Sequence, residues 1–130
     1  MDQNNLQAVP FDYVVTSPLL AANATGSATL LFMADSEFEI HYFLGISSAD
    51  TLSQPTNNNF SVLITDGATG RAFASQRVPQ ALFSGNAFNS SPELRAPRFL
   101  PQTNLVFDFL NLTGGNNTVT IVLKGTKFLL

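Results

Sequence analysis

The 130-residue sequence contains no cysteine and no tryptophan, and only one histidine. The absence of cysteine excludes a disulfide scaffold, a thiolate nucleophile, and zinc or iron–sulfur sites with cysteine ligands. A Ser-His-Asp triad would have to use His41, and no G-x-S-x-G motif accompanies it. We therefore expect no catalytic residues, no cofactor and no metal requirement, and we interpret the chain as a non-enzymatic protein.

Charged residues are also scarce. They make up 12% of the sequence, which is roughly half the share found in an average soluble domain. The six basic residues are scattered singly and the net charge is −3, so no basic stripe is present to neutralise phosphates. The longest apolar run, residues 28–34, is interrupted by Thr29 and is far too short to span a membrane. Neither nucleic acid nor membrane is an expected partner.

Hydrophobic residues, by contrast, make up 45% of the chain, and 12 of them are phenylalanine. They recur in short runs separated by Gly, Pro, Asn and Ser, and no long window shows helical periodicity. We predict one all-β domain over residues 1–130, an antiparallel two-sheet sandwich of about eight short strands, with a jelly roll as the favoured topology. An immunoglobulin-like sandwich is the alternative, although its cysteine pair and tryptophan are absent. The phenylalanines would fill the space between the two sheets.

The strands are placed by hydrophobic runs and by the turn residues between them. The run at residues 28–33 is almost continuously apolar, as in a strand buried on both faces. A hairpin turn is predicted at residues 66–70, with a returning strand behind it, and Gly114-Gly115 predicts a second hairpin between the last two strands. A short helical turn is expected after Pro79, and an irregular loop at residues 84–97. The predicted strands are 9–16, 28–33, 37–46, 60–65, 71–77, 105–110 and 119–124.

The segment DSEFEIHYF, residues 35–43, combines acidic, aromatic and imidazole side chains. As a strand it has one apolar face and one mixed face. The apolar face would hold Phe38, Ile40, Tyr42 and Leu44, and the mixed face Glu37, Glu39, His41 and Phe43. The side chains expected in the core are Phe38, Ile40, Tyr42, Val62, Ile64, Phe107, Phe109, Val119, Ile121 and Leu123.

The mixed face could hold a metal or an acid–base pair. Successive same-face side chains of one strand are about 7 Å apart, which is too far for Glu37, Glu39 and His41 to chelate a metal unaided. A carboxylate pair could serve glycoside hydrolysis, but the chain has no tryptophan and only two tyrosines to hold a sugar. Asp50 and Asp66 lack the spacing of a calcium loop. We expect an ordinary strand that faces solvent or a partner; Glu37, Glu39, His41 and Asp66 are the ligands to test first if a metal proves necessary.

Four arginines lie in the predicted return strand and in the Pro-rich loop: Arg71, Arg77, Arg95 and Arg98. Solvated surface charge is one interpretation of them. Polar contact between copies is the other, because arginine is enriched in protein interfaces.

The order of these landmarks resembles a group of small virion structural proteins from tailed bacteriophages. The resemblance covers most of the chain. The similar segments are Val-Pro-Phe at 9–11, ADSEFE at 34–39, TDGATGR at 65–71, PRFLPQTNLVF at 97–107, and NLT at 111–113 followed by 119–127.

This resemblance implies a β-sandwich of the phage particle, made in the host cytoplasm and located in the virion. It implies first a capsid decoration, or cement, protein, which would stabilise the head lattice by binding the major capsid protein as a homo-oligomer, a trimer or a dimer. The alternative is a tail, neck or fibre-associated structural or host-binding module. A cellular carbohydrate-binding or enzymatic sandwich is a third possibility. An extended N-terminal arm, residues 1–10, and the loop 84–101 are the segments expected to reach partners.

Overall fold

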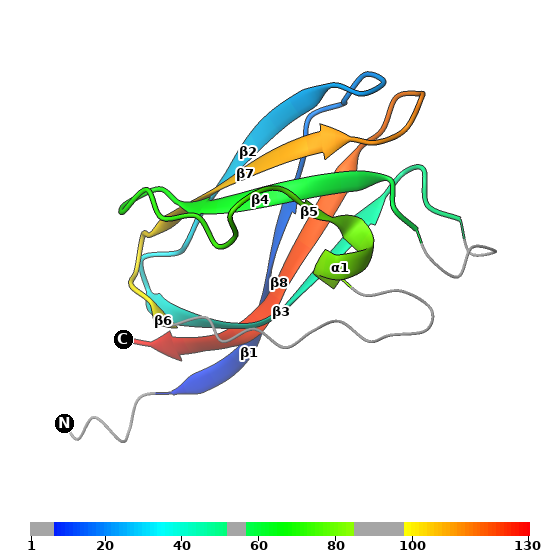
Figure 1. The fold of residues 1–130 in the computed structure, drawn as a ribbon. Helices are drawn as coiled ribbons and strands as arrows, with labels where there is room; N and C mark the ends of the chain where they lie inside the picture. The colour runs from blue at the N-terminus through cyan, green and yellow to red at the C-terminus, as the bar shows by residue number, and fades with distance from the viewer. Residues whose placement is uncertain (1–6, 52–56, 85–97) are drawn as a thin grey trace.

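The computed structural model describes residues 7–51, 57–84 and 98–130 and contains two four-stranded antiparallel sheets (Figure 1). The first sheet has the order β1-β8-β3-β6, with β1 at Ala8–Thr16, β8 at Val119–Leu129, β3 at Ser36–Ser47 and β6 at Arg98–Phe99. The second has the order β2-β7-β4-β5, with β2 at Thr25–Leu31, β7 at Asn104–Asn111, β4 at Phe60–Asp66 and β5 at Val78–Pro79. The expected helical turn after Pro79 is confirmed as α1, Gln80–Ser84.

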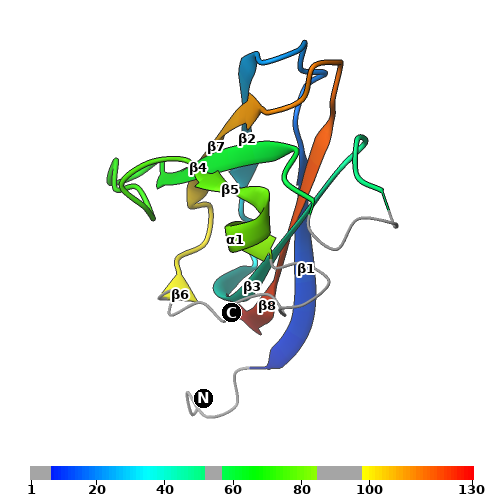
Figure 2. The same ribbon diagram turned by 45° about the vertical axis from the view of Figure 1, so that its right-hand side comes forward.

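The strand pairing is that of a jelly roll. Strand β1 pairs with β8, β2 with β7, β3 with β6, and β4 with β5, so the first half of the strands pairs with the second half in reverse order. Figure 2 shows the two sheets as separate layers facing one another. The predicted all-β antiparallel sandwich is confirmed.

The core lies between the two sheets and is built largely from aromatic rings. Nine of the ten expected core side chains are buried, all except Tyr42. Tyr13 from β1 contacts the rings of Phe32 and Phe38, each at a centroid distance of 4.8 Å, and Phe32 also packs on Phe99 of β6 at 5.6 Å. Rings of this size span the gap between facing sheets, which explains the high phenylalanine content.

The predicted alternation of β3 is wrong beyond Ile40, because a β-bulge interrupts it. The register against β8 shifts between Ile40 and Tyr42, so His41 is an extra residue on β3. Past the bulge the two faces exchange. Tyr42 is 39% exposed, whereas Phe43, expected to face outward, is 4% exposed and belongs to the core. A single inserted residue reverses the facing of every side chain that follows it.

A glycine on the neighbouring strand accommodates this bulge. Gly125 of β8 is paired with Ile40, directly before the extra residue. A β-carbon on Gly125 would collide with the carbonyl oxygen of Glu39 and would lie 2.8 Å from the ring of Phe38. The close approach of the two backbones therefore requires glycine at this position.

The second sheet corrects the prediction for residues 28–33. This run is not buried on both faces, because β2 lies at the edge of its sheet and only its inner face is covered. Leu31 at the end of the strand is 60% exposed, and Met33 just beyond it is also exposed.

Two predicted hairpins have different outcomes. The turn at 66–70 is confirmed: Gly70 N donates to Asp66 O at 2.8 Å, and Gly70 has the positive φ of 74° that glycine adopts readily. The return strand at 71–77 is wrong, since that segment forms only an isolated bridge between Thr65 and Ala72 before the two-residue β5. The hairpin at Gly114-Gly115 is also wrong, because β7 and β8 lie in different sheets.

The last three residues of the expected arm over residues 1–10 lie in a strand instead. Ala8, Val9 and Pro10 are part of β1 and pair with residues 126–128 of β8. Likewise, Phe99 within the expected loop 84–101 is buried in β6. Residues 1–6 and 85–97 of these two segments lie outside the described residues.

Candidate functional site

The acidic and imidazole side chains of β3 lie on the outer face of the first sheet. Glu39 Oε1 is 3.4 Å from His41 Nε2, which also contacts Thr126 Oγ1 at 3.2 Å. Glu37 Oε1 is 3.5 Å from Arg98 Nη1. Each carboxylate thus has its own basic partner, and the two do not form a shared acid–base pair.

Asp66, the remaining candidate ligand, does not lie on the outer face of the first sheet with Glu37, Glu39 and His41. It ends β4 in the other sheet, where Oδ1 accepts a hydrogen bond from Ala68 N at 2.9 Å in the turn. In the part of the chain that the structure describes, no three His, Cys, Asp or Glu side chains gather closely enough to hold a metal ion.

The first sheet carries an apolar surface, which we call the outer apolar patch: the exposed Val14, Tyr42, Leu44 and Ile46 and the half-buried Val122. The strand register sets these side chains in neighbouring rows. Val14 of β1, Val122 of β8 and Leu44 of β3 form one row across the sheet, and Ile46 and Tyr42 lie in the rows on either side. Ile46 is 64% exposed and Val14 55%. Tyr42 and Leu44 are 39% and 37% exposed.

The patch depends on the bulge at His41. Without the extra residue, Tyr42 and Leu44 would point into the core and Phe43 would point to solvent. With it, a tyrosine and aliphatic side chains share the solvent face, which is the composition found at the centre of protein interfaces. Contiguous exposed apolar surface of this kind marks interaction sites on soluble proteins.

Beside the patch lies a shallow hollow with a volume of about 520 Å³. Its lining residues are Pro10, Phe11, Asp12, His41, Lys124 and Gly125. Lys124 Nζ and Asp12 Oδ2 are 3.0 Å apart and both side chains are exposed, so the ion pair forms a polar margin between hollow and patch. An apolar centre with a charged margin suits a protein surface better than a small polar substrate.

The arginines do not form one shared surface. Arg98 in β6 pairs with Glu37 on the first sheet, whereas Arg77 pairs with Asp108 of β7 on the second sheet, with Nη2 and Oδ2 2.9 Å apart. Arg95 lies outside the described residues. Arg77 and Arg98 are therefore engaged within their own sheets, whereas Arg71 is exposed at the end of the 66–70 turn.

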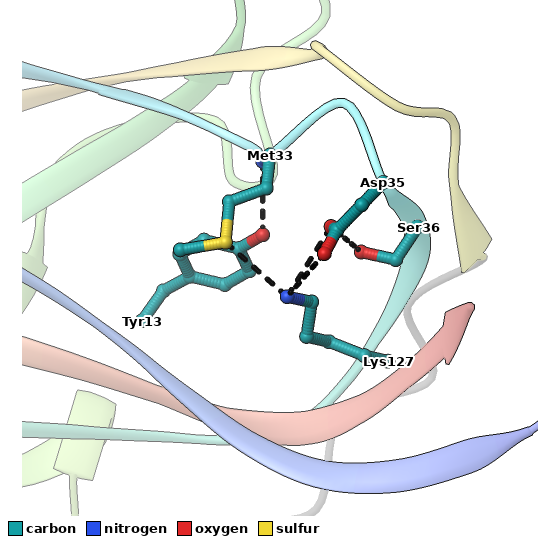
Figure 3. A network of polar contacts seen from close by, with 5 residues as sticks. All are labelled: Tyr13, Met33, Asp35, Ser36 and Lys127. Atoms are coloured by element: carbon teal, nitrogen blue, oxygen red, sulfur yellow. Dashed lines mark hydrogen bonds and ion pairs between the residues drawn. The ribbon is translucent and has the colours of Figure 1, made fainter. Parts of the chain in front are cut away.

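A buried lysine that sequence reasoning missed closes one end of the sandwich (Figure 3). Lys127 of β8 points inward and is 6% exposed. Its Nζ lies 3.3 Å from Asp35 Oδ1 and 3.2 Å from Met33 Sδ, and 4.2 Å from the centre of the Phe11 ring. Met33 N in turn donates to Tyr13 Oη at 3.0 Å. The lysine thereby ties β8 to the β2–β3 turn. Alternation along β8 was the signal that could have placed it inward.

Asp35 is the titratable group that this cluster perturbs. Ser36 Oγ donates to Asp35 Oδ1 at 3.0 Å. This hydrogen bond is the main influence and lowers the pKa of Asp35; desolvation opposes it, and the nearby Lys127 ammonium lowers the pKa further.

A depressed carboxyl pKa links stability to pH. A carboxyl group whose pKa is lower in the folded state than in the unfolded state stabilises the fold at pH values above its unfolded-state pKa. This stabilisation is lost as the pH falls through the folded-state pKa. We expect the urea midpoint of the wild type to exceed that of Asp35→Asn at about pH 7, and the two midpoints to converge below about pH 4. Urea titrations of both proteins at several pH values across this range measure the difference in midpoint. A constant difference at all pH values would contradict the linkage.

A second feature missed from the sequence is a network of buried amides at the other end of the sandwich. Gln80 Nε2 and Asn59 Nδ2 each donate to a carboxylate oxygen of Asp50 at 2.8 Å. Asn117 Nδ2 donates to Asn59 O at 3.1 Å and to Asn111 Oδ1 at 3.4 Å. The network joins the β3–β4 loop, α1 and the β7–β8 crossover. Its role is structural, because Gln80, Asn111 and Asn117 are almost wholly buried.

No model of a known protein family matches the sequence, and no curated protein matches it either. Among solved structures, the chain is similar to the Drosophila NLP-core, whose crystal structure is described as giving insight into pentamer formation and histone binding. The identity is 14% and the TM-score 0.40, over 88% of this chain and 96% of that chain. A TM-score this low bears on neither the fold nor the function of this protein. Within the described residues, no helix is long and apolar enough to cross a membrane.

Proposed function

We propose that the protein is a non-enzymatic structural protein of a tailed-phage particle, a capsid decoration protein that binds the major capsid protein through the outer apolar patch. The observation that carries this proposal is the patch itself, which the bulge at His41 turns toward solvent. The phage assignment is supported by the sequence resemblance to small virion proteins. It is compatible with the jelly roll, a fold of many viral capsid domains that other proteins also use.

The binding energy of many copies attached through this surface would add up over the lattice of an assembled head. One copy presents a patch of five side chains with a margin formed by Asp12 and Lys124. A small interface of this kind is weak alone, but repetition over symmetric sites of an assembled head multiplies its effect. The protein would therefore bind assembled heads better than free capsid subunits.

The test compares two Glu substitutions at equally exposed aliphatic positions. Ile46→Glu puts a charge in the patch, and Leu19→Glu puts one on the β1–β2 connection; the two side chains are 64% and 68% exposed. We expect Ile46→Glu to weaken binding to decoration-free heads at least about tenfold, which corresponds to about 1.4 kcal/mol. Leu19→Glu should bind like the wild type. Co-sedimentation over a range of protein concentrations measures both, after thermal melts show that each variant is folded.

Three outcomes separate the possibilities. Equal binding by Ile46→Glu and the wild type would exclude the patch as the docking surface. Failure of the wild type to bind heads, together with binding to purified tails or necks, would replace the decoration role with the tail, neck or fibre alternative. Failure to bind either would reject a virion role.

A further inference from the structure

Within the described part of the chain the two sheets have four edge strands, and three of them carry features that discourage pairing with another chain. Strand β6 has only two residues, one of them Arg98, and β5 has only two, one of them Pro79. Strand β1 is longer, but it contains Pro10 and the charged Asp12. Short length, proline and charge are the usual means by which proteins protect sheet edges.

Strand β2 has none of these protections among the residues that the structure describes. Its seven residues, TGSATLL, include no charge and no proline. Each of them is paired with β7 without a register shift, so no bulge twists the edge away. Figures 1 and 2 both show β2 at the margin of its sheet, with β7 as its neighbour. An unprotected edge of this length is a ready template for another strand.

The backbone groups that face outward can be identified from the ends of the strand. Ala24 O accepts from Asn111 N at 2.9 Å, and Phe32 N donates to Thr103 O at 2.9 Å, so both of these residues direct backbone groups toward the β7 side. Backbone groups alternate sides along an antiparallel strand. The odd-numbered residues between them therefore direct their N–H and C=O groups toward the open edge. These residues are Thr25, Ser27, Thr29 and Leu31.

We propose that β2 pairs antiparallel with β2 of a second copy about a two-fold axis. The axis passes beside Ala28, the middle residue of the strand. Ser27 then lies opposite Thr29 of the second copy, and Thr25 opposite Leu31 of the second copy, so that the outward backbone groups meet in hydrogen-bonded pairs. Two four-stranded sheets join into one continuous sheet of eight strands.

A second copy fits this edge better than an unrelated strand, for two reasons. The strand is uncharged, so identical strands meet without like-charge repulsion, and the facing Ser and Thr side chains form favourable cross-strand pairs. A two-fold contact is also closed at two copies. The dimer thus covers the unprotected edge of each copy, and the edges that it leaves outside, β1, β5 and β6, are the protected ones of the described residues. The outer apolar patch lies on the other sheet.

The register of the proposed β2–β2 pairing can be tested with two double variants that differ from each other in one introduced charge. In S27K/T29K, the introduced lysines face each other twice across the axis. In S27E/T29K, an introduced glutamate faces an introduced lysine twice. We expect wild type and S27E/T29K to sediment at twice the chain mass of 14.0 kDa, and S27K/T29K to sediment as a 14.0 kDa monomer. Thr16→Lys, on the exposed edge strand β1, is the control and should remain a dimer.

Hydrogen exchange supplies a second measurement that does not depend on the variants. In the wild type at high concentration, the amides of Ser27 and Thr29 should exchange slowly, and dilution below the dissociation constant should make them exchange at least about tenfold faster. A monomeric wild type, a stoichiometry above two, a dimeric S27K/T29K, or fast exchange at Ser27 and Thr29 in the dimer would each overturn the proposal.

Discussion

Replacing Ile121 by alanine is expected to lower the free energy of unfolding by about 2–5 kcal/mol. Ile121 is fully buried in β8, the strand that lies between β1 and β3, where it is paired with Val15 on one side and Gly45 on the other. Truncation removes buried apolar surface and leaves a cavity that the aromatic core cannot easily fill.

Ile46→Ala is the matched control, because the same atoms are removed from the outer face of the same sheet. Ile46 is mostly exposed, so its truncation should change the free energy of unfolding by less than about 0.5 kcal/mol. Urea unfolding of both variants under identical conditions gives the two values. Comparable losses from the two substitutions would show that the inner and outer faces of this sheet have been assigned wrongly.

Gly125→Ala is expected to destabilise the fold by about 1–3 kcal/mol, although it adds one methyl group. That methyl group would run into the carbonyl oxygen of Glu39 at the bulge, and the obstructing atom is backbone, which cannot rotate away. Either the bulge shifts or the pairing of β3 with β8 opens locally. Because the bulge orients Tyr42 and Leu44, the variant should also weaken binding through the outer apolar patch.

The control is Gly114→Ala in the β7–β8 crossover, where a β-carbon meets no atom within 4 Å. This substitution should be neutral or slightly stabilising, because alanine restricts the unfolded chain more than glycine does. Thermal melts and urea titrations of both glycine variants make the comparison. Equal stability of Gly125→Ala and wild type would mean that the backbones of β8 at Gly125 and of β3 at Glu39 do not approach each other this closely.

Much of the fold follows from local sequence. The alternation of Phe60, Val62 and Ile64 specifies one buried face without any knowledge of the neighbouring strands, and the same holds for Phe107 and Phe109. Turn residues at 66–70 marked the end of β4 correctly. These signals depend on a few adjacent residues, which is why they were sufficient.

Features that depend on distant residues were not predictable in the same way. The bulge at His41 follows a run in which Tyr42, Phe43 and Leu44 are all apolar, so neither face could be recognised from polarity alone. Gly114-Gly115 has the composition of a hairpin turn, yet the pairing of β7 with β2 and of β8 with β1 directs the chain across to the other sheet. In both places the pairing with strands distant in the sequence, and not the local composition, determines the path of the chain.

The candidate site was predicted only in part. Glu37, Glu39 and His41 were correctly placed on a strand, but Tyr42 was assigned to the core and Leu44 to the same apolar face, whereas both side chains are exposed. The cluster around Lys127 joins residues 11, 33, 35 and 127, and no local pattern relates them. Sequence reasoning recognised the strand and missed the surface that the strand presents.

The reversed pairing of the strands also governs the order in which the molecule can fold during its synthesis. Ala8 at the start of β1 is paired with Phe128 near the end of β8, and β8 separates β1 from β3 in the first sheet. The first sheet therefore cannot close on the ribosome until residues 119–129 have emerged, and contacts so distant in sequence form slowly. Until then β3 lacks its neighbour β8, and the phenylalanine-rich inner faces of β4 and β7 lack the sheet that covers them. The nascent chain thus presents chaperones with a long-lived apolar surface that the native protein hides.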